Sequence, residues 1–194
     1  MGDIRLDKIY KKYGETAVFE GFSETFGAGE AVAVMGPSGT GKTTLLRLIM
    51  GLEKPDSGEI IGTGNERYAC VFQENRLIPS LTAYENVYAV CHDAEKSLHL
   101  LSEVGLSDDA GKYPAEMSGG MARRVAIARA LAFPHDILLL DEPFTALDAE
   151  IKAKVTELIN RTEKDNLIVA VTHDPEEAAA LGCTTVPITP PAQK

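Results

Sequence analysis

A glycine-rich segment of the chain has the residues needed to hold a chain of phosphates. Residues 36–43 read Gly-Pro-Ser-Gly-Thr-Gly-Lys-Thr, which fits the pattern G-x-x-x-x-G-K-[ST]. Glycines let the backbone N–H groups of such a loop turn inward around an anion, and the helix behind it points its positive end at the same phosphates. In this pattern Lys42 reaches the β- and γ-phosphates, and the Thr43 hydroxyl binds Mg²⁺. An apolar run at 31–35 precedes the loop, so we favour phosphate binding over an ordinary glycine turn.

Two acidic residues further along the chain suit the other half of that chemistry. Asp141 and Glu142 follow the apolar run 137–140, where an unpaired buried carboxylate would be costly. A metal ion or a hydrogen-bonded water removes that cost, so we predict that Asp141 binds Mg²⁺ and that Glu142 polarises the attacking water. The alternative for both residues is an exposed loop after a core strand.

Three further positions are weaker candidates. Ser118-Gly119-Gly120 precedes a helix expected over 121–133 and is a second possible anion site, although the same residues also form ordinary linkers and N-caps. Gln73 and His173 each follow an apolar run. Taken alone, each is as compatible with a structural role as with a catalytic one.

The composition limits the classes of protein that are possible. The 194 residues are 44% hydrophobic and carry a net charge of −10, which suits one sizeable α/β core. The acidic balance argues against nucleic-acid binding, and the one basic pair, Arg123-Arg124, is expected to be solvated or salt-bridged. No apolar run has the roughly 18 residues of a membrane span, and the N-terminus lacks the character of a signal peptide. The three cysteines stand far apart, which indicates neither zinc nor a disulfide framework.

The apolar pattern predicts the elements that position these residues. We expect short strands within 4–26, a strand at each of 31–35, 69–72, 137–140 and 167–171, and a hairpin over 58–73. Helices are expected over 43–50, over 148–161 with Asp148 as N-cap, and after Asp174, with a helical insert over about 74–133.

The predicted strands share one regularity. The runs that end at Met35, Leu140 and Val171 each lead directly into polar residues. Ligands of open α/β sheets bind outside the carboxyl ends of the strands. If the three strands are parallel neighbours, the phosphate loop, the acidic pair and His173 therefore meet at one site.

In this order, the motifs resemble those of the ATP-binding cassette (ABC) ATPases over about residues 4–186. The resemblance implies an α/β fold with a P-loop NTPase core, a mostly parallel sheet, an N-terminal antiparallel β subdomain and an α-helical insert. It also implies one cassette domain over 1–194. Residues 1–73 and 134–194 would form the core, and about 74–133 the helical subdomain that bears the signature motif.

The resemblance also implies roles for individual residues. Tyr13 would stack on adenine, Gln73 would serve catalysis and the metal, and His173 would be the switch histidine, catalytic like Glu142. Ser118, Gly119 and Gly120 would contact the ATP of a second copy, and Asp148 lies in the D-loop. The nucleotide-binding loop would comprise Gly36, Pro37, Ser38, Gly39, Thr40, Gly41, Lys42, Thr43 and Thr44, and Thr43, Gln73 and Asp141 would form the metal site.

By the same resemblance the cofactors are ATP and Mg²⁺, and two cassettes, identical or paired, close head to tail. Other partners would be transmembrane permease subunits and an extracytoplasmic substrate-binding protein, with no nucleic acid. The chain would act at the cytoplasmic face of the inner membrane and be soluble when isolated. Residues 71–77 are similar to importer subunits for nitrate, sulfonate or taurine. One departure is Met121, where the family usually has Gln.

We therefore predict an ATPase subunit that powers an ABC transporter, in particular a bacterial importer. Three alternatives remain open: an ABC-type ATPase that acts on DNA or ribosomes, a phosphate-loop kinase of small metabolites, and an ATP-binding partner subunit with weak hydrolysis.

Overall fold

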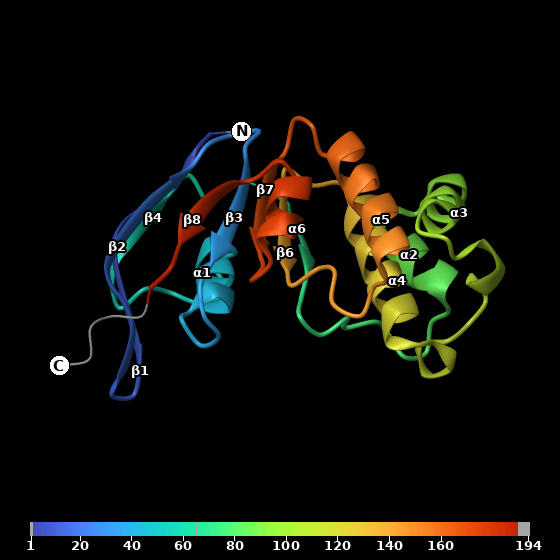
Figure 1. Ribbon diagram of the computed structural model, residues 1–194, viewed down its shortest axis with the longest axis horizontal. Coiled ribbons are helices and arrows are strands. Elements are labelled where there is room, and N and C mark those ends of the chain that lie inside the picture. Colours follow the sequence, from blue (N-terminus) through green and yellow to red (C-terminus); the bar gives the residue numbers. More distant parts are fainter. Residues whose placement is uncertain (1, 65, 190–194) are drawn as a thin grey trace.

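Two β-sheets and a group of helices lie side by side in the computed structural model, which describes residues 2–64 and 66–189 (Figure 1). The antiparallel sheet has the order β2-β1-β4, from β1 (Ile4–Tyr13), β2 (Thr16–Phe26) and β4 (Ser57–Ile61). The parallel sheet has the order β5-β6-β7-β3-β8, from β3 (Ala31–Met35), β5 (Tyr68–Val71), β6 (Ile137–Asp141), β7 (Leu167–Val171) and β8 (Thr184–Pro187).

The helices follow the predicted order. They are α1 (Lys42–Ile49), α2 (Ala83–Cys91), α3 (Ala94–Glu103), α4 (Gly119–Ala132), α5 (Ala149–Thr162) and α6 (Pro175–Ala180), with short 3₁₀ turns at Ser107–Asp109 and Pro114–Glu116. Side chains cap five of them, and three of these caps are ones that the sequence predicts or allows. Asp148 and Asp174 accept backbone N–H groups of α5 and α6, and Ser118 caps α4. With that cap, α4 begins at Gly119, two residues before the predicted start.

The predicted meeting of strand ends is confirmed. Strands β6, β7 and β3 are hydrogen-bonded parallel neighbours, with β7 in the centre. Their carboxyl ends therefore lie at the same edge of the sheet, and the segments that follow Met35, Asp141 and Val171 leave from that edge.

The predicted hairpin over 58–73 is wrong. Strand β4 pairs with β1 in the antiparallel sheet, whereas β5 joins β6 in the parallel sheet. The burial pattern explains the separation: β4 is mostly exposed, as suits a sheet edge, whereas Ala69 and Val71 of β5 are fully buried.

The parallel sheet separates two hydrophobic clusters. Ile137 and Leu139 of β6 pack with α1 and the antiparallel sheet, while Leu138 and Leu140 pack with helices α2 to α5. This alternation is the period of two expected of a strand buried on both faces. Figure 1 shows the same order of layers, with α1 toward the antiparallel sheet and α4 and α5 toward the helical side. The helical insert therefore shares its core with one face of the sheet.

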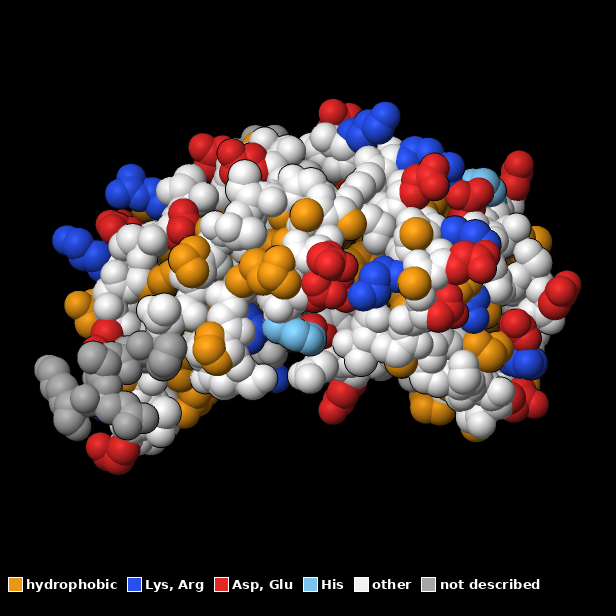
Figure 2. Space-filling model, in the orientation of Figure 1, with side chains coloured by type: hydrophobic (Ala, Val, Ile, Leu, Met, Phe, Trp, Pro, Cys, Tyr) orange, Lys and Arg blue, Asp and Glu red, His pale blue; other side chains and the backbone are white. Residues whose placement is uncertain are grey.

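Two general properties bear on function. None of the helices in the described ranges has the length and apolar character that crossing a membrane requires. On the face shown in Figure 2, Lys and Arg side chains are scattered among Asp and Glu and form no continuous basic surface in the part of the chain that the structure describes.

Candidate active site

A cleft of about 490 Å³ lies at the carboxyl edge of the parallel sheet, beside the antiparallel sheet. Its walls come from five separate segments of the chain and bring together most of the residues that the sequence singles out. The lining residues are Tyr13, Thr16, Val18, Ser38, Gly39, Gly41, Lys42, Thr43, Thr44, Gln73, Asp141, Glu142 and Val171.

The glycine-rich loop has the backbone that anion binding requires. Gly39 and Gly41 have φ angles of 80° and 97°, in the left-handed region that side chains disfavour. A Cβ on Gly41 would come within 2.3 Å of Val18, and one on Gly36 within 2.3 Å of the Ile188 carbonyl oxygen. Gly39 is therefore required by its conformation, Gly36 by the close approach of another backbone, and Gly41 by both.

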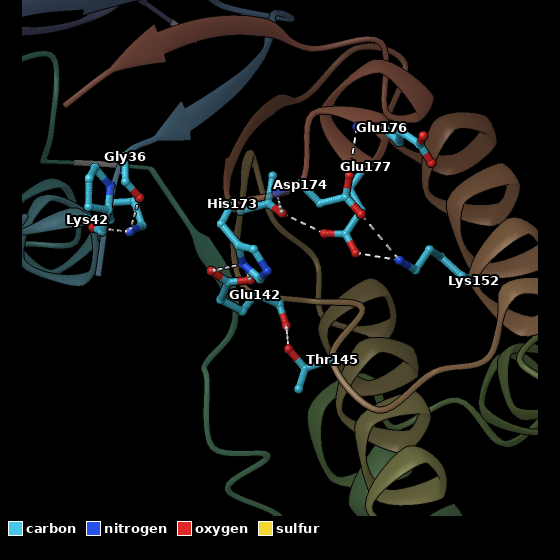
Figure 3. A network of polar contacts seen from close by, with 11 residues as sticks. Gly36, Lys42, Glu142, Thr145, Lys152, His173, Asp174, Glu176 and Glu177 are labelled. Atoms are coloured by element: carbon cyan, nitrogen blue, oxygen red, sulfur yellow. Dashed lines mark hydrogen bonds and ion pairs between the residues drawn. The ribbon is translucent and has the colours of Figure 1, made fainter. Parts of the chain in front are cut away.

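The lysine of the loop is held inside it. Lys42 is only 9% exposed, and its Nζ donates to the carbonyl oxygens of Gly36 and Pro37 at 2.7 and 2.8 Å (Figure 3). The Thr40 hydroxyl also donates to Pro37. Gly36, Pro37 and Thr40 thus shape the loop from within rather than line the cleft.

The predicted metal ligands touch each other although they are far apart in sequence. The Thr43 hydroxyl donates to Oδ2 of Asp141 at 2.9 Å. Asp141 is 3% exposed, and burial raises the pKa of its carboxyl, against the lowering effect of the Thr43 hydrogen bond and of the nearby Arg123 and Lys42 charges. A hydroxyl and a buried carboxylate at one point are oxygen ligands of the kind that Mg²⁺ prefers together with nucleotide phosphates. The residues present therefore fit that ion.

The second acidic residue is held in an unusual backbone conformation. Glu142 has φ 49°, and a non-glycine residue persists there only when its surroundings fix it. Its N–H donates to the Val171 carbonyl, and its own carbonyl accepts from the Thr145 hydroxyl. The carboxylate faces Nδ1 of His173 at 3.0–3.1 Å. Figure 3 shows the two side chains directed at each other from the ends of β6 and β7.

The histidine is exposed but its backbone is anchored. The hydrogen bond and the charge of Glu142 raise the pKa of His173, whose side chain is 78% exposed. The preceding residue, Thr172, is buried and donates to Glu177 at 2.6 Å, and Glu177 also accepts from Lys152. This buried network fixes the strand end from which His173 projects (Figure 3).

Tyr13 lies at the mouth of the cleft with nearly half of its surface exposed. Its hydroxyl donates to Glu53, and Nζ of Lys11 lies 5.3 Å from the ring centroid. The Tyr13 ring is therefore oriented by charged neighbours. Thr16 and Val18, which line the same wall, were missed by the sequence reasoning because neither belongs to a motif, although both follow the Tyr13-Gly14 turn.

Ser118, Gly119, Gly120 and Asp148 line no part of the cleft, as far as the described residues show. The Ser118 hydroxyl accepts from the N–H of Met121, and Asp148 accepts from the N–H of Ile151. Met121 itself packs against the hydrophobic core of the helical side. We call Ser118–Gly120 the signature turn. Within one chain this turn forms the N-terminus of α4 and lies outside the cleft that holds the phosphate loop.

Arg123 contradicts its sequence prediction. We expected a solvated or salt-bridged surface residue, but Arg123 is 3% exposed. It donates to the carbonyl oxygens of Phe72 and Gln73 at 2.5 and 2.7 Å. The pattern gave no signal for this, because the acceptors are backbone groups some 50 residues away.

Comparison with known proteins places the chain in a family. Residues 19–145 match the ABC transporter family. The aliphatic sulfonates import ATP-binding protein SsuB 1 of Rhodococcus jostii is 42% identical over 185 residues, which cover 92% of this chain and 76% of the relative. The sulfate/thiosulfate import ATP-binding protein CysA of Burkholderia mallei is 40% identical over 90% of this chain and 56% of its own length.

Solved structures agree. The dimeric structure of MJ0796, described as a bacterial ABC transporter cassette, matches with a TM-score of 0.84 and 31% identity, covering 95% of this chain and 94% of that one. A second structure of MJ0796, in a post-hydrolysis state bound to ADP and Pi, matches with a TM-score of 0.81 and 33% identity over 91% of this chain and 90% of that one.

The chain therefore belongs to the ABC transporter family, as an ATP-binding cassette and thus an ATPase. The predicted fold class and the predicted likeness to importer subunits for small anions are confirmed. The alternative of a small-metabolite kinase is inconsistent with this assignment.

Proposed function

We propose that this chain is the ATP-hydrolysing subunit of a bacterial importer for a small sulfur-containing oxyanion, and that it works as a pair of cassettes closing on ATP. The observation that carries the proposal is the meeting of Lys42, Thr43, Asp141 and Glu142 in one cleft. The sulfonate and sulfate importers named above support the substrate class. They also favour an importer over an ABC-type ATPase that acts on DNA.

The phosphates would lie along the loop of residues 36–44, with Lys42 turned toward the β- and γ-phosphates. Thr43, Asp141 and Gln73 would hold Mg²⁺, which neutralises the charge that develops on the phosphates. Tyr13, at the mouth of the same cleft, would stack on the adenine.

The hydrolytic water would be oriented by Glu142. Its carboxylate is only 19% exposed and already faces His173, so the two side chains can share a proton and hold the water in line with the γ-phosphate. The left-handed backbone at Glu142 aims this carboxylate. In the closed, ATP-bound pair, His173 would keep the Glu142 carboxylate in place as the γ-phosphate leaves.

A second copy would complete the site. Ser118, Gly119 and Gly120 begin an α-helix of 14 residues, whose N-terminus suits a phosphate, yet they do not line the cleft of their own chain. A twofold pair would place this turn over the γ-phosphate of the partner, with Asp148 near the same junction. Closure of the pair with ATP and opening after hydrolysis would move permease subunits at the cytoplasmic face of the membrane. An extracytoplasmic binding protein would deliver the substrate.

The proposal is tested with Glu142→Gln, which removes the acceptor of the water proton but preserves the shape of the side chain. We expect hydrolysis to fall by roughly 10²–10⁴-fold, while ATP and Mg²⁺ still produce dimers in size-exclusion chromatography with light scattering. The wild-type chain should hydrolyse ATP only with a divalent cation.

A control separates the closing pair from a weakly active partner subunit. If wild-type turnover equals background while Glu142→Gln still dimerises with ATP, the chain is an ATP-binding partner rather than a hydrolytic subunit, as Met121 in the signature turn would then indicate. Wild-type rates in Glu142→Gln would contradict the assignment of Glu142.

A further inference from the structure

Helix α4 carries three arginines, and each binds backbone carbonyl groups of another segment. Arg123 donates to Phe72 and Gln73, and Arg129 donates to Asn75 and Arg76 at 3.1 and 2.9 Å. Arg124 donates to the carbonyls of residues 104 and 105, at the end of α3. The helix that begins with the signature turn is therefore tied to its neighbours through side-chain donors.

The segment 72–76 receives most of these bonds. Four of its five carbonyl groups, those of residues 72, 73, 75 and 76, accept from Arg123 or Arg129. The segment follows β5, an edge strand that pairs only with β6 among the described strands. It folds back on itself, with the Arg76 guanidinium 4.1 Å above the Phe72 ring and a left-handed φ of 47° at Arg76. The two arginines of α4 thus fix the backbone on which Gln73 stands.

The two arginines differ in the charges around them. Burial lowers the pKa of Arg123, but the charges of Asp141 and Glu142 oppose that effect, which places both carboxylates in its electrostatic reach. For Arg129, burial alone lowers the pKa. A buried guanidinium that meets only neutral carbonyls is costly, and one near carboxylates is compensated. Because Val71 pairs with Leu140, the Phe72 carbonyl that Arg123 binds lies beside Asp141 at the carboxyl edge of the sheet. Arg123 therefore contacts the loop and also brings its charge to the acidic pair, whereas Arg129 anchors the loop further along, at Asn75 and Arg76.

We propose that Arg123 is a positioning residue that links the orientation of α4, and so of the Ser118–Gly120 turn, to Gln73 and to the carboxylates of Asp141 and Glu142. This inference rests on the proposed function of those residues. Any tilt of α4 moves the two hydrogen bonds that hold the Gln73 backbone, and it moves the positive charge relative to the acidic pair. One side chain thereby connects the half of the site that faces the partner with the half that holds the phosphates.

Three variants separate the two parts of this role. Arg123→Met removes both the charge and the two N–H donors that bind the Phe72 and Gln73 carbonyls. Arg123→Lys keeps the charge but cannot span two carbonyls in the same way. Arg129→Met removes the donors to the same loop without changing a charge beside the acidic pair. Circular dichroism and thermal unfolding check that each variant is folded. Removing one member of a buried, charge-compensated arrangement is destabilising, so Arg123→Lys, which keeps the charge, is the milder second variant and tests the inference if Arg123→Met does not fold.

The first readout needs neither metal nor nucleotide. Hydrogen–deuterium exchange of peptides covering 70–78 should be faster in all three variants than in the wild type, because each loses carbonyl anchors. The second readout is steady-state hydrolysis against ATP and against Mg²⁺. We expect kcat of Arg123→Met to fall roughly 10- to 100-fold, as for a misplaced catalytic group, with KM for ATP within about twofold and with a higher Mg²⁺ requirement. Arg123→Lys should be intermediate, and Arg129→Met should keep its kcat within about threefold.

The outcomes are distinct. Wild-type kcat and Mg²⁺ dependence in Arg123→Met would overturn the inference, and so would equal losses in Arg123→Met and Arg129→Met, because loop anchoring alone would then explain both. A wild-type chain that hydrolyses no ATP would instead contradict the proposed function, while the exchange measurement would still report whether Arg123 holds the segment 72–76.

Discussion

Two glycine-rich turns in this chain each begin a helix, but they are built differently. The phosphate loop precedes α1, where the N-cap Gly41 has φ 97° and no side chain caps the helix. The signature turn precedes α4, where the Ser118 side chain caps the N–H of Met121. The first turn leaves its backbone donors for a ligand and surrounds a buried lysine. The second turn satisfies one backbone N–H group of its own helix, that of Met121, and directs its other N–H groups outward.

The surroundings of the two turns differ in the same sense. The phosphate loop meets Asp141, Glu142 and Tyr13 in a cleft of its own chain, and its Thr43 bonds to Asp141. The signature turn meets residues 145–148, to which the resemblance gives the role of the D-loop. A Cβ on Gly120 would lie 2.7 Å from the Ala146 carbonyl oxygen, and Ala146 itself has a left-handed φ of 65°. One turn has its chemical partners in its own chain, whereas the other, in the described part of that chain, packs against Ala146 and lines no part of the cleft. The comparison therefore predicts that damage to the two turns will have different consequences.

Lys42→Met should have the largest effect on ATP binding, because it removes a buried ammonium from the turn that is complete in one chain. Hydrogen bonds to charged groups contribute about 1.5–3 kcal/mol, so we expect ATP affinity of the monomer to fall roughly 10- to 150-fold and hydrolysis to fall at least as much. Calorimetric titration of the nucleotide measures the affinity. Unchanged ATP affinity would mean that Lys42 remains bound to Gly36 and Pro37 rather than turning to the phosphates.

Ser118→Arg is the matching change in the other turn. The side chain is exposed, so the monomer should fold and bind ATP within about twofold of the wild type, whereas hydrolysis should fall about 100-fold because the bulky cation blocks closure of the pair. ATP-dependent dimers of Glu142→Gln should also disappear when Ser118→Arg is added. If Ser118→Arg hydrolyses ATP at the wild-type rate, the signature turn does not complete a partner's site.

Features that depend on neighbouring residues could be predicted from the sequence, whereas pairing between distant segments could not. The caps Asp148 and Asp174 and the polar ends of β3, β6 and β7 were predictable because each signal is local. The separation of β4 from β5 was not, because pairing with β1 or with β6 is decided by contacts distant in sequence.

The same limit applies within the site. Motifs located Lys42, Thr43, Asp141 and Glu142, but the left-handed backbone of Glu142 and the burial of Arg123 have no signature in the sequence. Arginine is usually exposed, and here its acceptors are carbonyl groups, which every residue type carries. The roles of Ser118, Gly119 and Gly120 remain predictions for a further reason, since they depend on a second copy.

A smaller effect is expected within the signature turn itself, where Gly119 provides a matched control for Gly120. A Cβ on Gly120 collides with the Ala146 backbone, whereas one on Gly119 approaches nothing closer than the Ala146 Cβ at 4.0 Å. Gly120→Ala should lower the free energy of unfolding of the nucleotide-free chain by about 1–3 kcal/mol. Gly119→Ala should be neutral or stabilising by up to about 1 kcal/mol. Denaturant unfolding of both variants measures this, and equal stabilities would show that the D-loop yields to the added methyl group.

The smallest predicted effect concerns the loop after α4, at the far end of that helix from the signature turn. His135 and Glu163 form an ion pair, 2.8 Å apart, whose side chains are 4% and 3% exposed. The second ring nitrogen of His135 contacts the Phe133 carbonyl oxygen at 2.6 Å, so both nitrogens face acceptors and favour the imidazolium form.

Burial by itself lowers the pKa of His135, but the hydrogen bonds to Glu163 and Phe133 outweigh it and the net shift is upward from 6.5. Burial likewise raises the pKa of Glu163, yet its hydrogen bonds to His135 and Asn166 leave it lowered from 4.5. The Glu163 contribution is present above pH 4.5 and is lost as the pH falls through its folded-state pKa. The His135 contribution is complete below pH 6.5 and is lost as the pH rises through the raised pKa of the folded state.

We therefore expect the stability difference between the wild type and Glu163→Gln to be largest at mildly acidic pH, between the ordinary pKa values of 4.5 for Glu163 and 6.5 for His135. It should shrink as the pH rises above 6.5 and through the raised pKa of His135 in the folded state. Urea unfolding at several pH values measures it, with Lys154→Gln, which removes an exposed ion pair on α5, as the control that should show no such trend. Neither Glu163→Gln nor Lys154→Gln should change the ATP affinity of the monomer, because none of these residues lines the cleft. If Glu163→Gln also lowered ATP affinity, a change beyond the C-terminal end of α4 would alter nucleotide binding at the phosphate loop. The two turns would then not act independently.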